Sequence, residues 1–438
     1  MSLLRGGSEV YCTVTTMSTC SRGKRRLIEA MISDAPITDP IQDYLRLRQM
    51  KLRVVVAAIA RWYSNKSKPQ RAPPRVKDAV TWESCTGALT DREFKRAYRL
   101  TRNEFNALHR RIITKVPGYE GSRSSGIDSR VRLASALRFL AGASYIDCMR
   151  IHGQRTAIFY RHFHETLDAI LKTEPLGVDW TDLCELEKLE RECSLPGAGN
   201  GAFRGIVGFV DGIVIRTRRP YYNEVSCVKD FYCARKKFWG INVQAVCTYT
   251  YKFTLFAVTT GSTAHDSTAF DGTAFAELTK KPESQGGIPF PFFLVGDAAY
   301  AGNPRILTPF AGSHAIGSDE DTYNYIHSSK RMAIECAFGV LVRRWGILWR
   351  PLEFSFKDNI RILNVLFRLH NICTLRRDSG KHVDRHHIDD IGYQPRSNED
   401  VVDAYCRCWE RAPDNRVAER TLRQKIAVDL MNAGCFRS

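Results

Sequence analysis

Hydrophobic positions follow two different spacings along this chain, and the change falls near residue 200. Between residues 90 and 195, apolar side chains such as Phe94 and Tyr98 recur at helical intervals, which predicts amphipathic helices. From residue 204, short β-branched runs replace this spacing and predict strands. The glycine-rich stretch 196–201 separates the two patterns. We therefore expect a helical region at 90–195 and a strand-containing domain at 204–374.

Capping boxes mark two helix starts in the helical region, Thr90 with Glu93 and Thr101 with Glu104. Further on, a short helix at 145–151, a break at His152-Gly153 and a helix from Thr156 outline a helix-turn-helix. In this interpretation four side chains face DNA: Gln154, Arg155, Arg161 and His162. A helical packing domain without groove contact explains the pattern equally well, because any helical bundle can produce this outline.

Apolar runs predict four strands after residue 204, at 205–215, 241–246, 253–258 and 292–297. Runs that are apolar at consecutive positions are typical of strands buried on both faces. The later segment 329–345 has helical spacing. Together these elements predict an α/β domain in which a mixed sheet is flanked by helices.

Four acids lie in or beside these elements: Asp211, Asp266, Asp297 and Glu335. A charge beside a buried strand is expected to be neutralised, paired or bound to a cation. Each acid also has a simpler interpretation. Asp211 and Asp297 could form hydrogen bonds within turns, and Asp266 could cap a helix. Glu335 could form an ion pair with Arg331, four residues earlier.

Phosphodiester cleavage would give these acids one shared purpose. Two Mg²⁺ or Mn²⁺ ions held by carboxylates generate a nucleophile at neutral pH and stabilise the leaving oxygen. Neighbouring strands with a helix packed across them can bring such oxygens to one point, which is the geometry of an RNase H-like core. The basic character of the chain favours this hypothesis.

Composition points to a polyanionic partner. Lys and Arg outnumber Asp and Glu by 65 to 47, giving a net charge of +18, and neutralising phosphates releases counterions. The chain shows no apolar stretch of membrane-spanning length and no signal-peptide pattern. Its 14 cysteines are dispersed without regular spacing, which favours reduced thiols. We therefore expect a protein inside the cell, without a membrane-spanning segment, that binds a polyanion. Charge alone does not separate DNA from RNA or an anionic membrane surface.

Both ends are expected to differ from the middle of the chain. Residues 1–80 hold 15 basic and 6 acidic residues and predict a largely disordered arm with one helix at 41–63. The cluster at 24–26 is interpreted either as a nuclear import signal or as a solvated charge run. Residues 375–438 predict a polar linker followed by a helix at 415–432.

The chain resembles a known family, the PIF/Harbinger transposases and their domesticated relatives, which are DDE superfamily endonucleases. The resemblance covers about 205–373 and is looser over the helical part. It rests on motifs that match in order and spacing: Val210-Asp211-Gly212, Arg235-Lys236-Lys237, Ile241 to Val246, Gly261-Ser262, His265-Asp266-Ser267, Gly296-Asp297, Tyr300, Arg331, Glu335, Phe338-Gly339, Arg344 and Leu369-His370-Asn371.

The resemblance implies an RNase H-like nuclease whose DDE triad is Asp211, Asp297 and Glu335. Asp266 matches an additional acidic position near the metals.

The chain departs from the family pattern at three places. Ala298-Ala299 stand where Ser-Gly is usual, Thr248 replaces a common aspartate, and Lys237 replaces a usual glycine. None of these departures removes a proposed metal ligand.

The predicted function is that of a metal-dependent DDE nuclease or transposase that cuts DNA and joins 3′ ends to target DNA. The alternatives are a domesticated DNA-binding protein without transposition and a scaffold whose acids only serve folding. Expected partners are two Mg²⁺ or Mn²⁺ ions, double-stranded DNA, a Myb-like protein and further copies of the chain, in the nucleus and cytoplasm. DNA contacts are expected at basic residues, with a solvated face as the alternative: Arg155, Arg161, Arg235, Lys236, Lys237, Arg343 and Arg344.

Overall fold

The computed structural model describes residues 48–55, 80–119, 127–193, 203–261, 266–300, 303, 305–374 and 415–432. The chain divides into two compact units, 1–76 and 77–438. In the first unit the described residues form an exposed helix, which falls inside the segment predicted to be helical. The predictions for 24–26 and 196–201 lie outside the described residues. Everything below concerns the second unit.

The second unit begins with helices whose starts follow the sequence signals. Both predicted capping boxes are present: Thr90 accepts from the Glu93 amide, Thr101 accepts from the Glu104 amide, and each glutamate accepts in return. The helices are α4 (Trp82–Thr86), α5 (Asp91–Tyr98), α6 (Arg102–Lys115), α7 (Ser129–Leu140), α8 (Tyr145–Ile151), α9 (Thr156–Thr173) and α10 (Leu183–Cys193).

Helices α8 and α9 lie at the place of the predicted helix-turn-helix, but two of the four side chains expected to face DNA point inward. Gln154 is 3% exposed and His162 is 1% exposed, so this part of the prediction is wrong. His162 lies one position before Phe163 on the buried face of α9, whereas Arg161 falls on the opposite, exposed face. Arg155 is also exposed. DNA contact by these two arginines stays a prediction.

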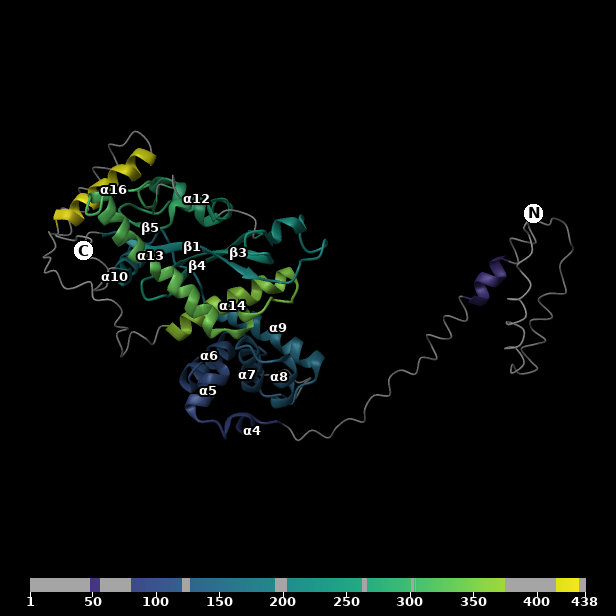
Figure 1. The fold of residues 1–438 in the computed structure, drawn as a ribbon. Helices are drawn as coiled ribbons and strands as arrows, with labels where there is room; N and C mark the ends of the chain where they lie inside the picture. Colours follow the sequence, from purple (N-terminus) through teal and green to yellow (C-terminus); the bar gives the residue numbers. More distant parts are fainter. Residues whose placement is uncertain are drawn as a thin grey trace, which may run out of the picture. The chain divides into compact units, whose positions relative to one another are not determined.

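A mixed sheet forms the middle of the unit (Figure 1). Its strands run in the order β2-β3-β1-β5-β6, and β4 also pairs with β3. β1 is antiparallel to β3 and parallel to β5, which confirms the predicted mixed sheet. The strands are β1 (Ile206–Arg216), β2 (Tyr232–Cys233), β3 (Phe238–Cys247), β4 (Phe253–Gly261), β5 (Phe293–Val295) and β6 (Ile306–Leu307).

Helices cover both faces of this sheet because side chains alternate along each strand. Phe209 and Val295 belong to the core that includes α13 (Asp319–Arg344) and α14 (Phe356–Thr374). Their neighbours Val210 and Leu294 belong to the core on the other face. That second face is covered by α10, α11 (Asp266–Asp271) and α12 (Ala274–Lys280). Short 3₁₀ helices complete the unit: η1 (Val228–Phe231), η2 (Glu283–Gln285), η3 (Ala298–Tyr300) and η4 (Gly346–Trp349).

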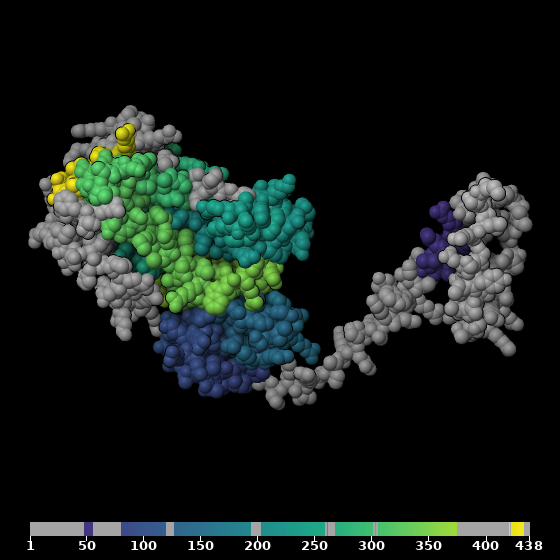
Figure 2. Space-filling view, in the orientation of Figure 1, coloured from purple at the N-terminus to yellow at the C-terminus, as the bar shows by residue number. Residues whose placement is uncertain are grey.

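The early helices and the sheet share one hydrophobic core. α14 packs against α9 on one side and against β4 on the other, and Figure 2 shows it in light green between the blue helical residues and the teal sheet. The last described helix, α16 (Asn415–Asn432), packs against α13 and buries Leu422, Ile426 and Leu430. No helix in the described ranges is long and apolar enough to span a membrane.

Candidate active site

Asp211 lies where strand β1 leaves the core. Residues 206–210 are buried, whereas 211–214 are half-buried. The parallel neighbour β5 ends at Val295, opposite Phe209, so β1 continues past its partner at this point. The Asp211 side chain is therefore 16% exposed. A carboxylate can be accommodated here because the strand is covered on both faces only before this position.

Asp297 follows the end of β5, the strand that lies next to β1. Val295 pairs with Phe209, and each aspartate follows its member of that pair by two residues. A Cβ atom built on Gly296 would lie 3.0 Å from the Val210 side chain. Residues 210 and 296 are therefore also neighbours, one position beyond the last paired residues of the two strands. Neighbouring strands are about 4.8 Å apart and side chains alternate. Continued by two residues, this register predicts adjacent positions for the two aspartates, on the face that carries Phe209 and Val295.

Glu335 reaches this face from helix α13, through Arg331. The Arg331 guanidinium donates to Asp211 Oδ2 at 3.0 Å and lies 2.6 Å from Glu335 Oε1. One arginine therefore binds the strand aspartate and the helical glutamate together. The predicted pairing of Arg331 with Glu335 is confirmed, and its second contact, with Asp211, is new.

Local hydrogen bonds also use both aspartates. Asp211 Oδ1 accepts from the Gly212 amide at 2.7 Å, and Asp297 Oδ1 accepts from the Ala299 amide at 2.9 Å. The turn interpretation is thus correct for one oxygen of each side chain. It does not account for Arg331, which binds the other oxygen of Asp211.

Asp266 is the first residue of α11, and its side chain lies outside what the structure describes. α11 packs against η3, the turn that follows Asp297. Phe270 of α11 stacks edge-on against Tyr300 of η3, with ring centroids 5.2 Å apart. The helix that begins at Asp266 is therefore fixed to the turn that follows Asp297.

Carboxylate oxygens are the donors that Mg²⁺ and Mn²⁺ prefer, so the chemistry of this donor set suits such an ion. Arg331 already supplies a positive charge between two of the acids. Among the residues that the structure describes, no group of three or more His, Cys, Asp or Glu side chains lies close enough to hold a metal ion. Asp211, Asp297 and Glu335 share one face without forming a closed metal cage.

A buried polar chain supports the site from the opposite face and was not assigned a role from sequence. Tyr300 donates to Gln244 Oε1 at 2.7 Å, and Gln244 donates to Asn242 Oδ1 at 3.0 Å. Gln244 pairs with Gly212, next to Asp211. This chain ties the turn after Asp297 to strand β3. The signal was visible in the sequence as two amides within an apolar strand.

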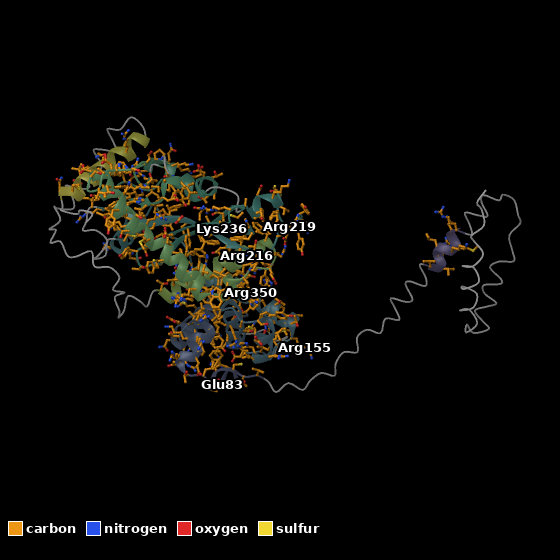
Figure 3. All side chains as sticks on the ribbon, viewed as in Figure 1. Glu83, Arg155, Arg216, Arg219, Lys236 and Arg350 are labelled. Carbon is orange, nitrogen blue, oxygen red and sulfur yellow. The ribbon has the colours of Figure 1, made fainter. Side chains whose placement is uncertain are left out.

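Basic residues gather where β1 meets the β2–β3 hairpin (Figure 3). We call Arg216, Arg219, Arg235, Lys236 and Lys237 the basic hairpin surface. The last three are exposed and join β2 to β3, while Arg216 lies over Phe238 at 5.6 Å and Arg219 over Trp239 at 5.3 Å. Arg216 is five residues from Asp211, about 17 Å along a strand.

Two further arginines near the site make contacts within the protein. Arg218 forms an ion pair with Glu224 at 2.6 Å and donates to two backbone carbonyls, so it holds its own loop. Arg344 is half-buried and donates to the His370 carbonyl at 3.5 Å. Its neighbour Arg343 is exposed and stays a predicted DNA contact.

Part of the chain matches a known protein family. Residues 210–371 match the family model described as DDE superfamily endonuclease. No curated protein and no solved structure matches the chain. The matched segment starts one residue before Asp211, ends at Asn371 and contains all four candidate acids. Residues 210–371 are therefore similar to the DDE superfamily endonucleases, a likeness to the superfamily and not to one subfamily within it.

Proposed function

We propose that this protein is a metal-dependent DNA endonuclease of the DDE type, with Asp211, Asp297 and Glu335 as catalytic carboxylates and Asp266 as a further metal ligand. The observation that supports the proposal is the arrangement of the three described acids on one face of the sheet. Two are adjacent through the β1–β5 register, and the third shares Arg331 with the first. The family match over 210–371 and the net charge of +18 support it.

In this proposal the four carboxylates would hold two Mg²⁺ or Mn²⁺ ions. Bound there, the ions supply a hydroxide nucleophile at neutral pH and stabilise the leaving oxygen of the phosphodiester. The protein's own part is positioning. The sheet register would hold the aspartates side by side, and Arg331 links Glu335 to Asp211.

The basic hairpin surface would position duplex DNA about 17 Å from the acids, by contacts to phosphates. Its arginines are backed by aromatic rings, which limits their freedom and favours defined contacts. As extensions of the same proposal, the protein acts in the nucleus as a PIF/Harbinger-type transposase. It joins 3′ ends to target DNA there, together with a Myb-like protein and further copies of the chain.

A second candidate is a DNA-binding protein that has kept the fold without cleavage. The ion pairs of Arg331 favour it, because they already neutralise Asp211 and Glu335. In that case the acids stabilise the fold, and DNA binding by the basic residues is the whole activity.

Cleavage of labelled duplex DNA in the presence of Mn²⁺ separates the two candidates. The wild type should nick the duplex, whereas Asp297→Asn and Glu335→Gln should lower the rate by about 100-fold or more while binding DNA equally well. Glu277→Gln, an exposed acid on α12 across the sheet, is the matched control and should cleave normally. Equal cleavage, or equal lack of it, by the wild type and both site variants would reject the nuclease.

A further inference from the structure

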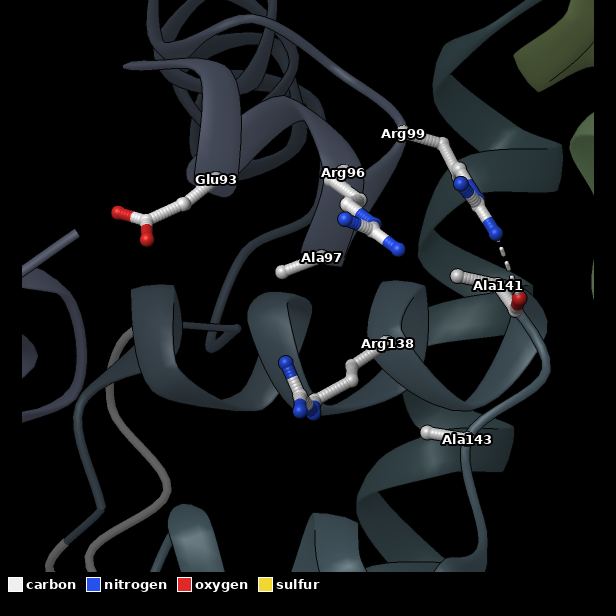
Figure 4. Close-up of a pocket in the computed structure, with 7 residues that line it drawn as sticks. All are labelled: Glu93, Arg96, Ala97, Arg99, Arg138, Ala141 and Ala143. Carbon is white, nitrogen blue, oxygen red and sulfur yellow. Dashed lines mark hydrogen bonds between the residues drawn. The ribbon is translucent and has the colours of Figure 1, made fainter. Parts of the chain in front are cut away.

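A pocket of about 300 Å³ lies between α5 and the end of α7, away from the candidate active site (Figure 4). Its volume is at the lower end of the range for small-ligand sites. Three arginines, one acid and three alanines line it: Arg96, Arg99, Arg138, Glu93, Ala97, Ala141 and Ala143. The lining is therefore rich in guanidinium groups and has little apolar bulk.

The positive charge of this pocket is not balanced by its acid. Glu93 closes the capping box of α5, where its Oε2 accepts from the Thr90 amide at 2.9 Å and the Thr90 hydroxyl at 2.8 Å. These bonds lower the pKa of Glu93, and Figure 4 shows its carboxylate turned away from the arginines. Within the described part of the chain, no carboxylate forms an ion pair with Arg96, Arg99 or Arg138.

Two guanidinium nitrogens in the pocket lack an acceptor. Nε of Arg99 and Nε of Arg138 are buried without a hydrogen-bond partner, although Arg99 Nη2 donates to the Ala141 carbonyl at 3.3 Å. Burial and the charges of Arg96 and Arg344 lower the pKa of Arg99. A buried donor without a partner costs free energy, and like charges repel. The repulsion is relieved when an anion binds between the arginines.

The pocket lies where the helical residues meet the end of helix α13. The chain after α7 touches η4 so closely that a Cβ on Gly142 would lie 2.9 Å from the Gly346 backbone. Arg344, whose charge acts on Arg99, is the last residue of α13, the helix that carries Glu335. A ligand here would therefore bind the helical residues close to the end of the helix that carries Glu335.

We propose that this pocket binds a phosphate group through Arg96, Arg99 and Arg138. Guanidinium groups match the phosphate oxygens in geometry and charge and form paired hydrogen bonds with them. Duplex DNA and a free polyphosphate offer the same group. If the phosphate belongs to DNA, this inference rests on the proposed function. Phosphate binding itself does not require DNA cleavage.

Thermal unfolding of the full chain with inorganic pyrophosphate tests the proposal. Pyrophosphate should raise the unfolding midpoint of the wild type in a saturable way. Arg138→Gln and Arg96→Gln should weaken its apparent affinity at least about tenfold, as expected when one charge-assisted contact is lost. Arg92→Gln is the matched control, since it removes one charge from the exposed surface of α5 outside the pocket. Arg96 is exposed, so its variant is expected to fold even where Arg138→Gln does not.

No pyrophosphate effect on the wild type, or an equal loss of affinity in Arg92→Gln, would overturn the proposal. Once selective loss is found, duplex binding by the same variants identifies the source. If the pocket variants bind duplex DNA more weakly than Arg92→Gln does, the natural ligand is a phosphate of the DNA backbone. If they bind the duplex as well as Arg92→Gln does, the natural ligand is a free polyphosphate. Cleavage by the wild type is measured separately, so failure of this site and failure of the nuclease proposal give different results.

Discussion

At the scale of single residues, backbone conformation explains one of the departures from the family pattern. Lys237, which stands where the family usually has glycine, has φ of +55°, in the left-handed region. It closes the hairpin in which Cys233 pairs with Phe238. The turn thus keeps the conformation that glycine adopts without strain, and a lysine adopts it at a cost.

Lys237→Gly should raise the free energy of unfolding by about 1 kcal/mol, because glycine removes the steric cost of positive φ. Urea unfolding at neutral pH measures this difference. Lys236→Gly is the matched control, because Lys236 does not have positive φ, and it should be neutral or destabilising. A Lys237→Gly variant no more stable than Lys236→Gly would contradict the explanation.

His162 is a second residue with a measurable consequence. It is buried, both ring nitrogens lack a hydrogen-bond partner, and burial with the charges of Arg132 and Arg161 lowers its pKa to about 4. Unfolded histidine titrates near 6.5. Between these values the unfolded chain binds a proton that the folded chain does not, so the stability of the folded protein falls as pH drops from 6.5 towards 4.

His162→Leu should therefore be at least as stable as the wild type at pH 7 and should lose less stability on acidification. The wild type should lose about 2 kcal/mol more than the variant between pH 7 and pH 5, at about 1.4 kcal/mol per unit below 6.5. Urea unfolding at the two pH values gives the comparison. Identical pH dependence of the two proteins would mean that His162 is not buried in its neutral form.

At the scale of elements, sequence patterns predicted those structures that local chemistry decides. Capping boxes marked α5 and α6, and β-branched runs marked β1 and β3. The parallel register of β1 with β5 was not predictable, because β5 has three residues and pairing depends on the surrounding core. The Asp211–Arg331 contact joins residues 120 positions apart, so no local pattern reports it.

Helix α14 holds strand β4 through one asparagine. Asn371 accepts from the Phe253 amide at 2.8 Å and donates to the Phe253 carbonyl at 2.7 Å, and His370 contacts the Tyr251 carbonyl at 2.8 Å. The motif that ends the family match is therefore structural. It attaches the start of β4 to the helix that joins the sheet to the helical residues.

Asn371→Leu should destabilise the protein by about 2–3 kcal/mol, because two hydrogen bonds are lost and the Phe253 amide is left without its acceptor. Hydrogen exchange should show the loss first in the amides of β4, while those of β5 keep their protection. Unchanged protection of β4 would show that the asparagine does not hold this strand.

At the scale of the whole molecule, one core unites the helical residues with the sheet and the candidate acids. Phe139 and Phe163 of the helices belong to the same hydrophobic cluster as Phe209 and Ile334. Basic groups lie on both parts, at Arg155 on the helices and at the basic hairpin surface beside the sheet. A duplex held by such charges should bind more weakly as salt increases.

The central claim is that Asp211, Asp297 and Glu335 hold divalent metal ions on one face of the sheet. Titration of the protein with Mn²⁺, followed by the electron paramagnetic resonance signal of free Mn²⁺, tests it without relying on catalysis. The wild type and Glu277→Gln should bind about two ions per chain, the number expected for phosphodiester chemistry of this kind, and Asp211→Asn and Asp297→Asn should each lose at least one. Equal Mn²⁺ binding by all four proteins would contradict the account.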